Sequence, residues 1–124
     1  MLGFLLLAIS IILSWIIYPI GIVYTFIKLT LLFNFKAIYR NIDNLCLSIA
    51  FSIDKLGNVA MQYIFNDLLI TRNGHKFGSA IHTISFVLGA NQKRETLRPL
   101  GQMLVNILNS LDENHCLKAY NNGI

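Results

Sequence analysis

The amino-acid sequence predicts an all-α protein, in which an N-terminal transmembrane helix, kinked near Pro19, continues into a small helical cytoplasmic domain. Three observations support this prediction. No charged side chain precedes Lys28. Apolar residues then recur at steps of three and four over 36–69, as in a helix with one apolar face. The chain has 124 residues, which is enough for one domain and not for two.

Charged residues are few and unevenly distributed. They make up 13% of the chain, whereas apolar residues make up 55%; soluble domains usually carry about 25% charged residues. Lys28, Lys36 and Arg40 follow the apolar segment directly, so part of the net charge of +4 is juxtamembrane. The other basic residues are scattered and no recognition motif accompanies them, so no nucleic-acid partner is expected.

Residues 1–35 are predicted to be a membrane anchor, with the lipid bilayer as its partner. About 20 apolar residues suffice to cross a bilayer, and a helix pairs every backbone amide internally. Pro19 is expected to kink this helix. The alternative is a re-entrant hairpin of Leu2–Tyr18 and Ile20–Phe35. A cleaved signal peptide is disfavoured, because the chain lacks a basic start and a small-residue cleavage site.

The orientation of the anchor follows from its flanking charges. Lys28, Lys36 and Arg40 lie on its C-terminal side, and positively charged flanks usually remain in the cytoplasm. The N-terminus is therefore expected outside, with domain 36–124 inside. This domain is small for a self-sufficient core, so self-association is a further expectation.

The pattern of domain 36–124 predicts helices joined by turns. A long amphipathic helix is predicted over 36–69, with Gly57 as a weak point inside it. A turn follows over 71–79, and then a short helix over 80–89, with Ser79 as N-cap and Gly89 as its stop. A strand at 80–89 is a weaker alternative.

Another helix is predicted over 97–111, where Thr96 is expected to cap and Pro99 to occupy the first turn. A short terminal helix through Tyr120 completes the domain.

The stretch LDENHCLKAY raises the possibility of catalysis. Asp112 and His115 share a helical face, so the carboxylate could orient the imidazole as a base, with Cys116 as nucleophile. However, Cys116 adjoins His115 and diverges from it by about 100° around a helix. The structural interpretation is favoured: Asp112 ends a helix, His115 lies at a polar boundary, and Cys116 and Tyr120 pack inward.

Other polar residues are interpreted structurally. Asp54 and Asn58, four positions apart on the long helix, are expected to hold a neighbouring loop by side-chain hydrogen bonds. Ser85 lies one turn from His82, but no nucleophile elbow supports catalysis there. The histidines show no metal-ligand spacing, and neither a metal nor another cofactor is expected. Cys46 is expected to be a buried thiol.

Three blocks carry a resemblance to a known group of proteins. They are SIDKLGNVAMQYIFNDLLI, KFGSAIHTISFVLGANQ and TLRPLGQMLVNILNSLDENHCLKAY. They resemble small phage and prophage proteins of unknown function, which have a middle block close to F-G-N-P-D-E-T-I-S-x-V-L-G-K-N and an ending like I-D-x-x-H-x-x-x-A. The similarity covers about 52–120. The matching positions are Asp54, Asn58, Phe77, Gly78, Thr83, Ile84, Ser85, Leu88, Gly89, Asn91, Asp112 and His115.

The resemblance implies a phage origin but no particular activity. Together with the predicted anchor, a phage origin gives the bacterial inner membrane as the expected location. The acidic pair that precedes the threonine in that group is Ile81 and His82 here. This departure favours a structural role for the block, or an inactive member of the group. Thr83 and Ser85 are accordingly treated as motif residues and not as catalytic ones.

Three functions are consistent with these observations. The first is a non-enzymatic interaction protein, single-pass at the inner membrane, that binds itself or a phage or host protein. The second is a holin-like pore-forming lysis protein, assembled from several copies of the N-terminal segment. The third is a membrane-tethered hydrolase that uses His115, Cys116 and Asp112.

Overall fold

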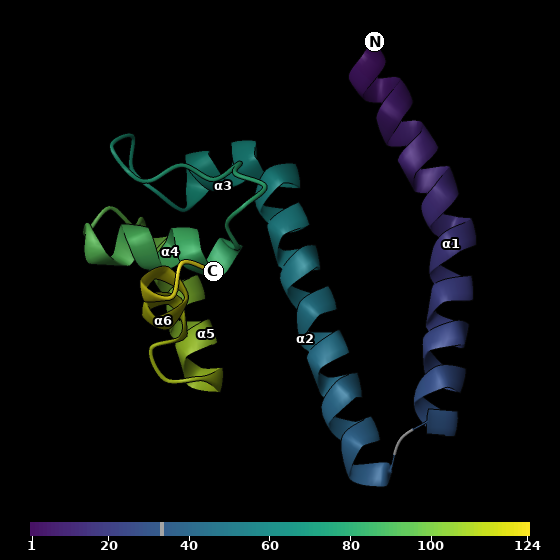
Figure 1. Cartoon of the computed structure of the whole chain (residues 1–124). Coiled ribbons are helices and arrows are strands. Elements are labelled where there is room, and N and C mark those ends of the chain that lie inside the picture. Colours follow the sequence, from purple (N-terminus) through teal and green to yellow (C-terminus); the bar gives the residue numbers. More distant parts are fainter. Residues whose placement is uncertain (33) are drawn as a thin grey trace. The chain divides into compact units, whose positions relative to one another are not determined.

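The computed structural model describes residues 1–32 and 34–124, and this part of the chain contains six helices (Figure 1). The helices are α1 Leu2–Leu32, α2 Phe35–Ala60, α3 Gln62–Leu68, α4 Ile84–Lys93, α5 Pro99–Leu111 and α6 His115–Asn121. The chain divides into two compact units, Met1–Cys46 and Leu47–Ile124, and the boundary falls within α2. The prediction of an all-α fold is confirmed at this level.

Helix α1 is the one helix in the described residues that is long and apolar enough to cross a membrane, over Leu2–Leu31. Its 31 residues, at about 1.5 Å each, exceed the roughly 30 Å of hydrocarbon in a bilayer. The helix runs through Pro19 without the turn that a hairpin would require. The kink at Pro19 stays a prediction.

Three hydroxyl side chains of α1 are hydrogen-bonded within the helix itself. The hydroxyls of Ser10, Ser14 and Thr30 each donate to a carbonyl three or four residues earlier, at 2.7 to 2.8 Å. Large apolar side chains cover the rest of its surface, and Trp15, for example, is 79% exposed. These three hydroxyls therefore need no partner outside the helix, which suits an apolar environment.

The single helix predicted over 36–69 is two helices, because α2 ends at Ala60 and α3 begins at Gln62. Met61, between them, has φ −98° and ψ 8°. Gly57 does not interrupt the helix; a Cβ there would lie 3.1 Å from Ile84 Cδ1, so this glycine allows α4 to approach. The sequence pattern did not predict this break at Met61.

Helix α4 begins and ends later than predicted. Thr83, not Ser79, is its N-cap, and the Thr83 hydroxyl accepts a hydrogen bond from the Phe86 amide at 3.1 Å. Gly89 lies inside the helix, where a Cβ would come within 2.0 Å of the Cys116 carbonyl oxygen. The glycine at 89 therefore serves the contact with α6 and does not end the helix.

The predicted terminal helices are present as α5 and α6. Pro99 occupies the first turn of α5 as expected, but Arg98 takes the capping position assigned to Thr96. The Thr96 hydroxyl instead donates to Asn91 Oδ1 at 2.6 Å. Beside it, Ile70 and Leu97 form an isolated antiparallel bridge. This pairing joins the loop after α3 to the segment that precedes α5.

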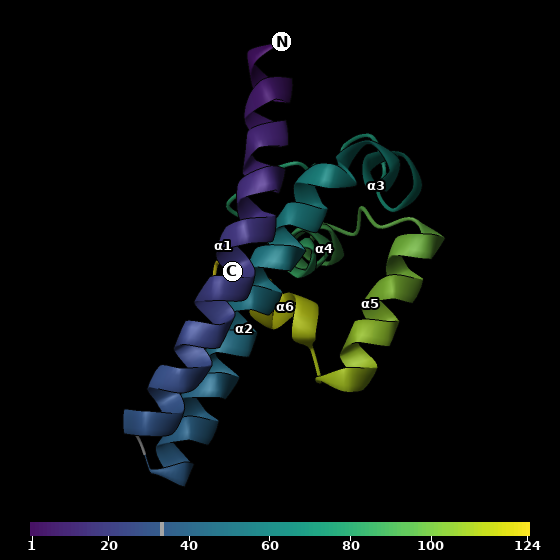
Figure 2. The same ribbon diagram turned by 90° about the vertical axis from the view of Figure 1, so that its right-hand side faces the viewer.

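The core of unit 47–124 lies between α4, α5 and α6, and α6 packs mainly on α4 (Figure 2). Its fully buried apolar side chains come from α4, α5, α6 and the end of the α3 segment: Ile70, Val87, Leu88, Val105 and Cys116. The unit therefore has a hydrophobic core of its own, in contrast to the exposed apolar surface of α1.

Candidate functional site

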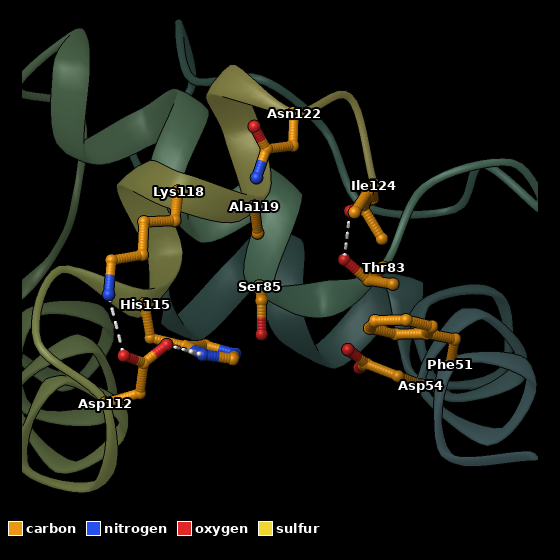
Figure 3. A pocket seen from close by; sticks show the side chains of 10 residues that line it. All are labelled: Phe51, Asp54, Thr83, Ser85, Asp112, His115, Lys118, Ala119, Asn122 and Ile124. Atoms are coloured by element: carbon orange, nitrogen blue, oxygen red, sulfur yellow. Dashed lines mark hydrogen bonds and ion pairs between the residues drawn. The ribbon is translucent and has the colours of Figure 1, made fainter. Parts of the chain in front are cut away.

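An open pocket of about 200 Å³ lies between the last turns of α2, the start of α4, and α6 (Figure 3). It belongs wholly to unit 47–124. Its lining combines acidic, basic, hydroxyl and apolar side chains: Phe51, Asp54, Thr83, Ser85, Asp112, His115, Lys118, Ala119, Asn122 and Ile124. Five of the residues singled out from the sequence thus line one cavity: Asp54, Thr83, Ser85, Asp112 and His115.

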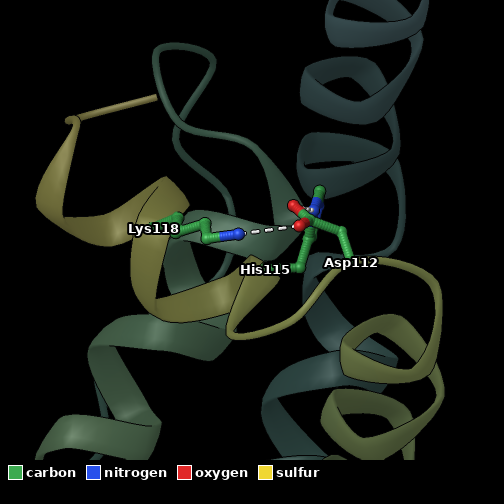
Figure 4. Close-up of polar contacts among 3 residues, drawn as sticks. All are labelled: Asp112, His115 and Lys118. Carbon is green, nitrogen blue, oxygen red and sulfur yellow. Dashed lines mark hydrogen bonds and ion pairs between the residues drawn. The ribbon is translucent and has the colours of Figure 1, made fainter.

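One side of the pocket is formed by a carboxylate held between two basic groups (Figure 4). Asp112, at the end of α5, accepts from Lys118 Nζ at 2.7 Å and contacts His115 Nδ1 at 3.2 Å. Hydrogen bonds from Lys118 and then His115 lower the pKa of Asp112, so its carboxylate stays ionised. An ionised carboxylate only accepts, so the contact is a hydrogen bond donated by His115 Nδ1, and Nε2 is the ring nitrogen directed away from Asp112.

Cys116 is not part of this group. Its side chain is completely buried among core residues, while His115 beside it is 39% exposed. Burial, and secondarily the charge of Asp54, raises the pKa of the Cys116 thiol to about 11. A thiol that stays protonated is a poor nucleophile, so this geometry does not support a cysteine hydrolase.

We predict that thiol reagents distinguish the two cysteines. Cys46, expected to be buried, is exposed, whereas Cys116 is enclosed. In the folded protein in detergent, a maleimide should modify Cys46 alone, and Cys116 should react only after denaturation. Mass spectrometry of digested samples measures this directly, with the Cys46→Ser variant isolating the second thiol. Rapid labelling of Cys116 in the folded variant would contradict the enclosed position.

The opposite side of the pocket is formed at the start of α4. Asp54 Oδ1 accepts from the Ile84 amide at 3.2 Å, so this carboxylate caps α4 from α2. Burial raises the pKa of Asp54, although the backbone hydrogen bonds from Ile84 and Ser85 and the charge of His115 oppose the shift. Ser85 is only 7% exposed, and its hydroxyl has no hydrogen-bond partner within residues 1–32 and 34–124.

Asn58 holds the loop before α4 from α2. Its side chain is fully buried; Nδ2 donates to the carbonyls of Ser79 and His82 at 3.0 and 2.8 Å, and Oδ1 accepts from the Gly78 amide at 3.0 Å. Both N–H donors of this amide and one of the two acceptor sites on its oxygen are therefore occupied. Asn58 and Asp54 thus both bind the segment that carries Thr83 and Ser85.

Two further asparagines, missed as structural residues from the sequence, hold the same loop. Asn66 pairs with both the amide and the carbonyl of Phe77, at 2.8 and 3.1 Å. Asn91 pairs in the same way with His75, at 2.8 Å for each bond. The available signal was a polar amide within an apolar helical segment, which is costly to bury unless it is bonded.

The aromatic residues near the pocket pack against one another. His82 stacks on Phe86 with ring centroids 3.8 Å apart, so the imidazole is committed to packing and does not pair with Ser85. Tyr120 contacts the same Phe86 ring at 5.3 Å, and Lys93 lies over Tyr120. Tyr120 therefore completes the α4–α6 contact, in the inward orientation expected of it.

Within residues 1–32 and 34–124, no group of three or more histidine, cysteine or acidic side chains is placed to hold a metal ion. The pocket instead brings together an oriented imidazole, a half-buried carboxylate and an unpartnered hydroxyl. Comparisons with known protein families, with curated proteins and with solved structures find no match to this chain.

Proposed function

We propose that this protein is a single-pass membrane protein of phage origin, in which α1 anchors a helical binding domain at the cytoplasmic face of a bacterial inner membrane. The observation that carries the proposal is the contrast between the two units. Helix α1 exposes almost all of its apolar side chains, whereas unit 47–124 encloses its own core and a polar pocket. Apolar surface on this scale calls for lipid or a partner to cover it.

The side of the membrane follows from charge. Lys28, Lys36 and Arg40 adjoin the C-terminal end of α1, and no charged side chain lies at its other end. The phage origin is supported by the resemblance of 52–120 to small phage proteins. The partner we propose is a ligand or protein group that enters the pocket, since the pocket presents polar groups that the fold itself leaves unused.

The expected result of membrane fractionation is that the full-length chain resists alkaline carbonate and is released by detergent. A reporter active only in the cytoplasm, fused after Ile124, should be active. The matched variant exchanges Lys28, Lys36 and Arg40 for glutamine; it should still be membrane-bound but should lose its single orientation. Full-length protein recovered in the soluble fraction without detergent would contradict the anchor.

A pore-forming, holin-like role is a second candidate, and one observation favours it. The hydroxyls of Ser10, Ser14 and Thr30 lie on a predominantly apolar helix, and several copies of α1 could pack through such small polar positions. Induced expression with a dye-permeability assay separates the two candidates, because an anchored binding protein leaves the membrane impermeable. The hydrolase that uses Cys116 is not proposed, because the thiol is enclosed.

A further inference from the structure

The pocket of unit 47–124 holds three groups that can each accept a further hydrogen bond. They are the Asp54 carboxylate, which has acceptor sites beyond its backbone hydrogen bonds, the Ser85 hydroxyl, and the ring nitrogen of His115 that does not face Asp112. Figure 3 shows the Ser85 hydroxyl directed toward the space between the His115 ring and the Asp54 carboxylate. Ser85 is more than nine-tenths buried and has no hydrogen-bond partner among the described residues, so the fold gives its hydroxyl no role of its own.

Hydrogen bonds within the fold fix the orientation of two of these groups, Asp54 and His115, and leave acceptor sites on them free for a ligand. Oδ1 of Asp54 accepts a hydrogen bond from the Ile84 amide. The other nitrogen of His115 faces Asp112, which fixes the tautomer. A buried hydroxyl without a partner and a half-buried carboxylate without a paired cation are costly, and a ligand that supplies donors and a positive charge lowers that cost.

The charged side chains of the pocket favour a positively charged ligand. The side chains of its lining include two carboxylates, Asp54 and Asp112, and one ammonium, Lys118. Lys118 is already paired with Asp112 at 2.7 Å, so Asp54 is the carboxylate without a cationic partner. The Phe51 ring adjoins Asp54 in the lining, and aromatic faces also attract cations.

We propose that this pocket binds the primary ammonium group of a small amine. An ammonium carries three N–H donors, which match the three acceptors supplied by Asp54, Ser85 and His115. A volume of about 200 Å³ admits the ammonium and a short alkyl stem. Asp54 supplies the charge, and Ser85 and His115 set the direction of the remaining bonds.

Two sources of this chemistry exist for a membrane-anchored protein: a free alkylamine, or the ethanolamine head group of a lipid. The inference rests on unit 47–124 being a binding domain. It does not depend on which side of the membrane the domain lies, so a failed orientation test leaves it standing. A failed amine test likewise leaves the membrane anchor standing.

The test is calorimetric titration of the full-length protein, in nanodiscs of phosphatidylcholine, with ethanolamine hydrochloride. We expect saturable binding, and none with ethylene glycol, which has the same length but no charge. Equal binding of both compounds, or no binding of ethanolamine, would overturn the proposal.

Matched variants locate the site. Asp54→Asn keeps an oxygen for the Ile84 amide but removes the charge, and it should weaken ethanolamine binding about tenfold or more, which corresponds to about 1.4 kcal/mol. Ser85→Ala and His115→Gln should each weaken it severalfold. Asp67→Asn, at an exposed position on α3, should bind as the unmodified protein does. Each variant is first checked for an unchanged unfolding temperature. Full ethanolamine affinity in folded Asp54→Asn or in folded Ser85→Ala would contradict the proposed site.

The source of the amine is distinguished by the lipid. In nanodiscs that contain phosphatidylethanolamine, a head group in the pocket should compete with free ethanolamine and lower its apparent affinity. Unchanged affinity identifies a soluble amine as the ligand. Both results support recognition of an ammonium group, and they differ only in what carries it.

Discussion

Replacing Gly89 with alanine is expected to disrupt unit 47–124 more than any other single methyl group added to a described glycine. The new Cβ would lie 2.0 Å from the carbonyl oxygen of Cys116 and 2.9 Å from Cβ of Tyr120. These are main-chain and Cβ atoms, so no side-chain rotation can relieve the clash, and α6 must move away from α4. Overpacking of this kind costs about 3 kcal/mol or more. Chemical denaturation in detergent, followed by near-ultraviolet circular dichroism, measures the loss.

The matched control is Gly57→Ala on α2. There the added Cβ meets only Ile84 Cδ1, at 3.1 Å, and this atom is the end of a flexible side chain. Alanine is also favoured over glycine in a helix by about 1 kcal/mol. We expect stability within about 1 kcal/mol of the unmodified protein. If the two variants were equally stable, the contact between α4 and α6 would not be as close as described.

Replacing Asn58 with alanine is the second change with a large expected effect. It leaves the Gly78 amide and the carbonyls of Ser79 and His82 without their partner, and it opens a cavity at a completely buried position. Unpaired buried groups cost about 1–3 kcal/mol each, although water recovers part of this loss. We expect the free energy of unfolding to fall by about 3 kcal/mol, as measured by urea denaturation.

Asn106→Ala is the control for the loss of an amide. Asn106 is exposed on α5 and accepts one hydrogen bond, from Gln102 at 2.9 Å, within the same helix. Its removal should change stability by no more than about 0.5 kcal/mol. A loss at Asn58 no greater than that at Asn106 would show that the loop does not depend on the buried amide.

Local sequence patterns predicted which segments are helical, because they depend on neighbours in the chain. The uncharged opening anticipates α1, and Pro99 anticipates the first turn of α5. The helix boundaries that failed depend on distant contacts. Gly89 has the composition of a helix stop, but its neighbour is Cys116, 27 positions later, and only the fold brings the two together.

The candidate site was visible in the sequence as separate parts but not as a pocket. Asp112 and His115 are close in sequence, and their pairing follows from spacing alone. Cys116 is adjacent to His115 in sequence, but on a helix its side chain points in a different direction and lies in the core. Ser85 and Asp54 come from other helices, and periodicity carries no information on which helix faces meet.

The bonds of Asn66 and Asn91 also bear on how the protein behaves in crowded solution. Each amide occupies both the N–H and the C=O of one loop residue, Phe77 or His75, as a neighbouring β-strand would. Extended backbone with open N–H and C=O groups invites edge-to-edge association between molecules. Two side chains thus give this segment the protection against aggregation that other folds obtain from an extra strand.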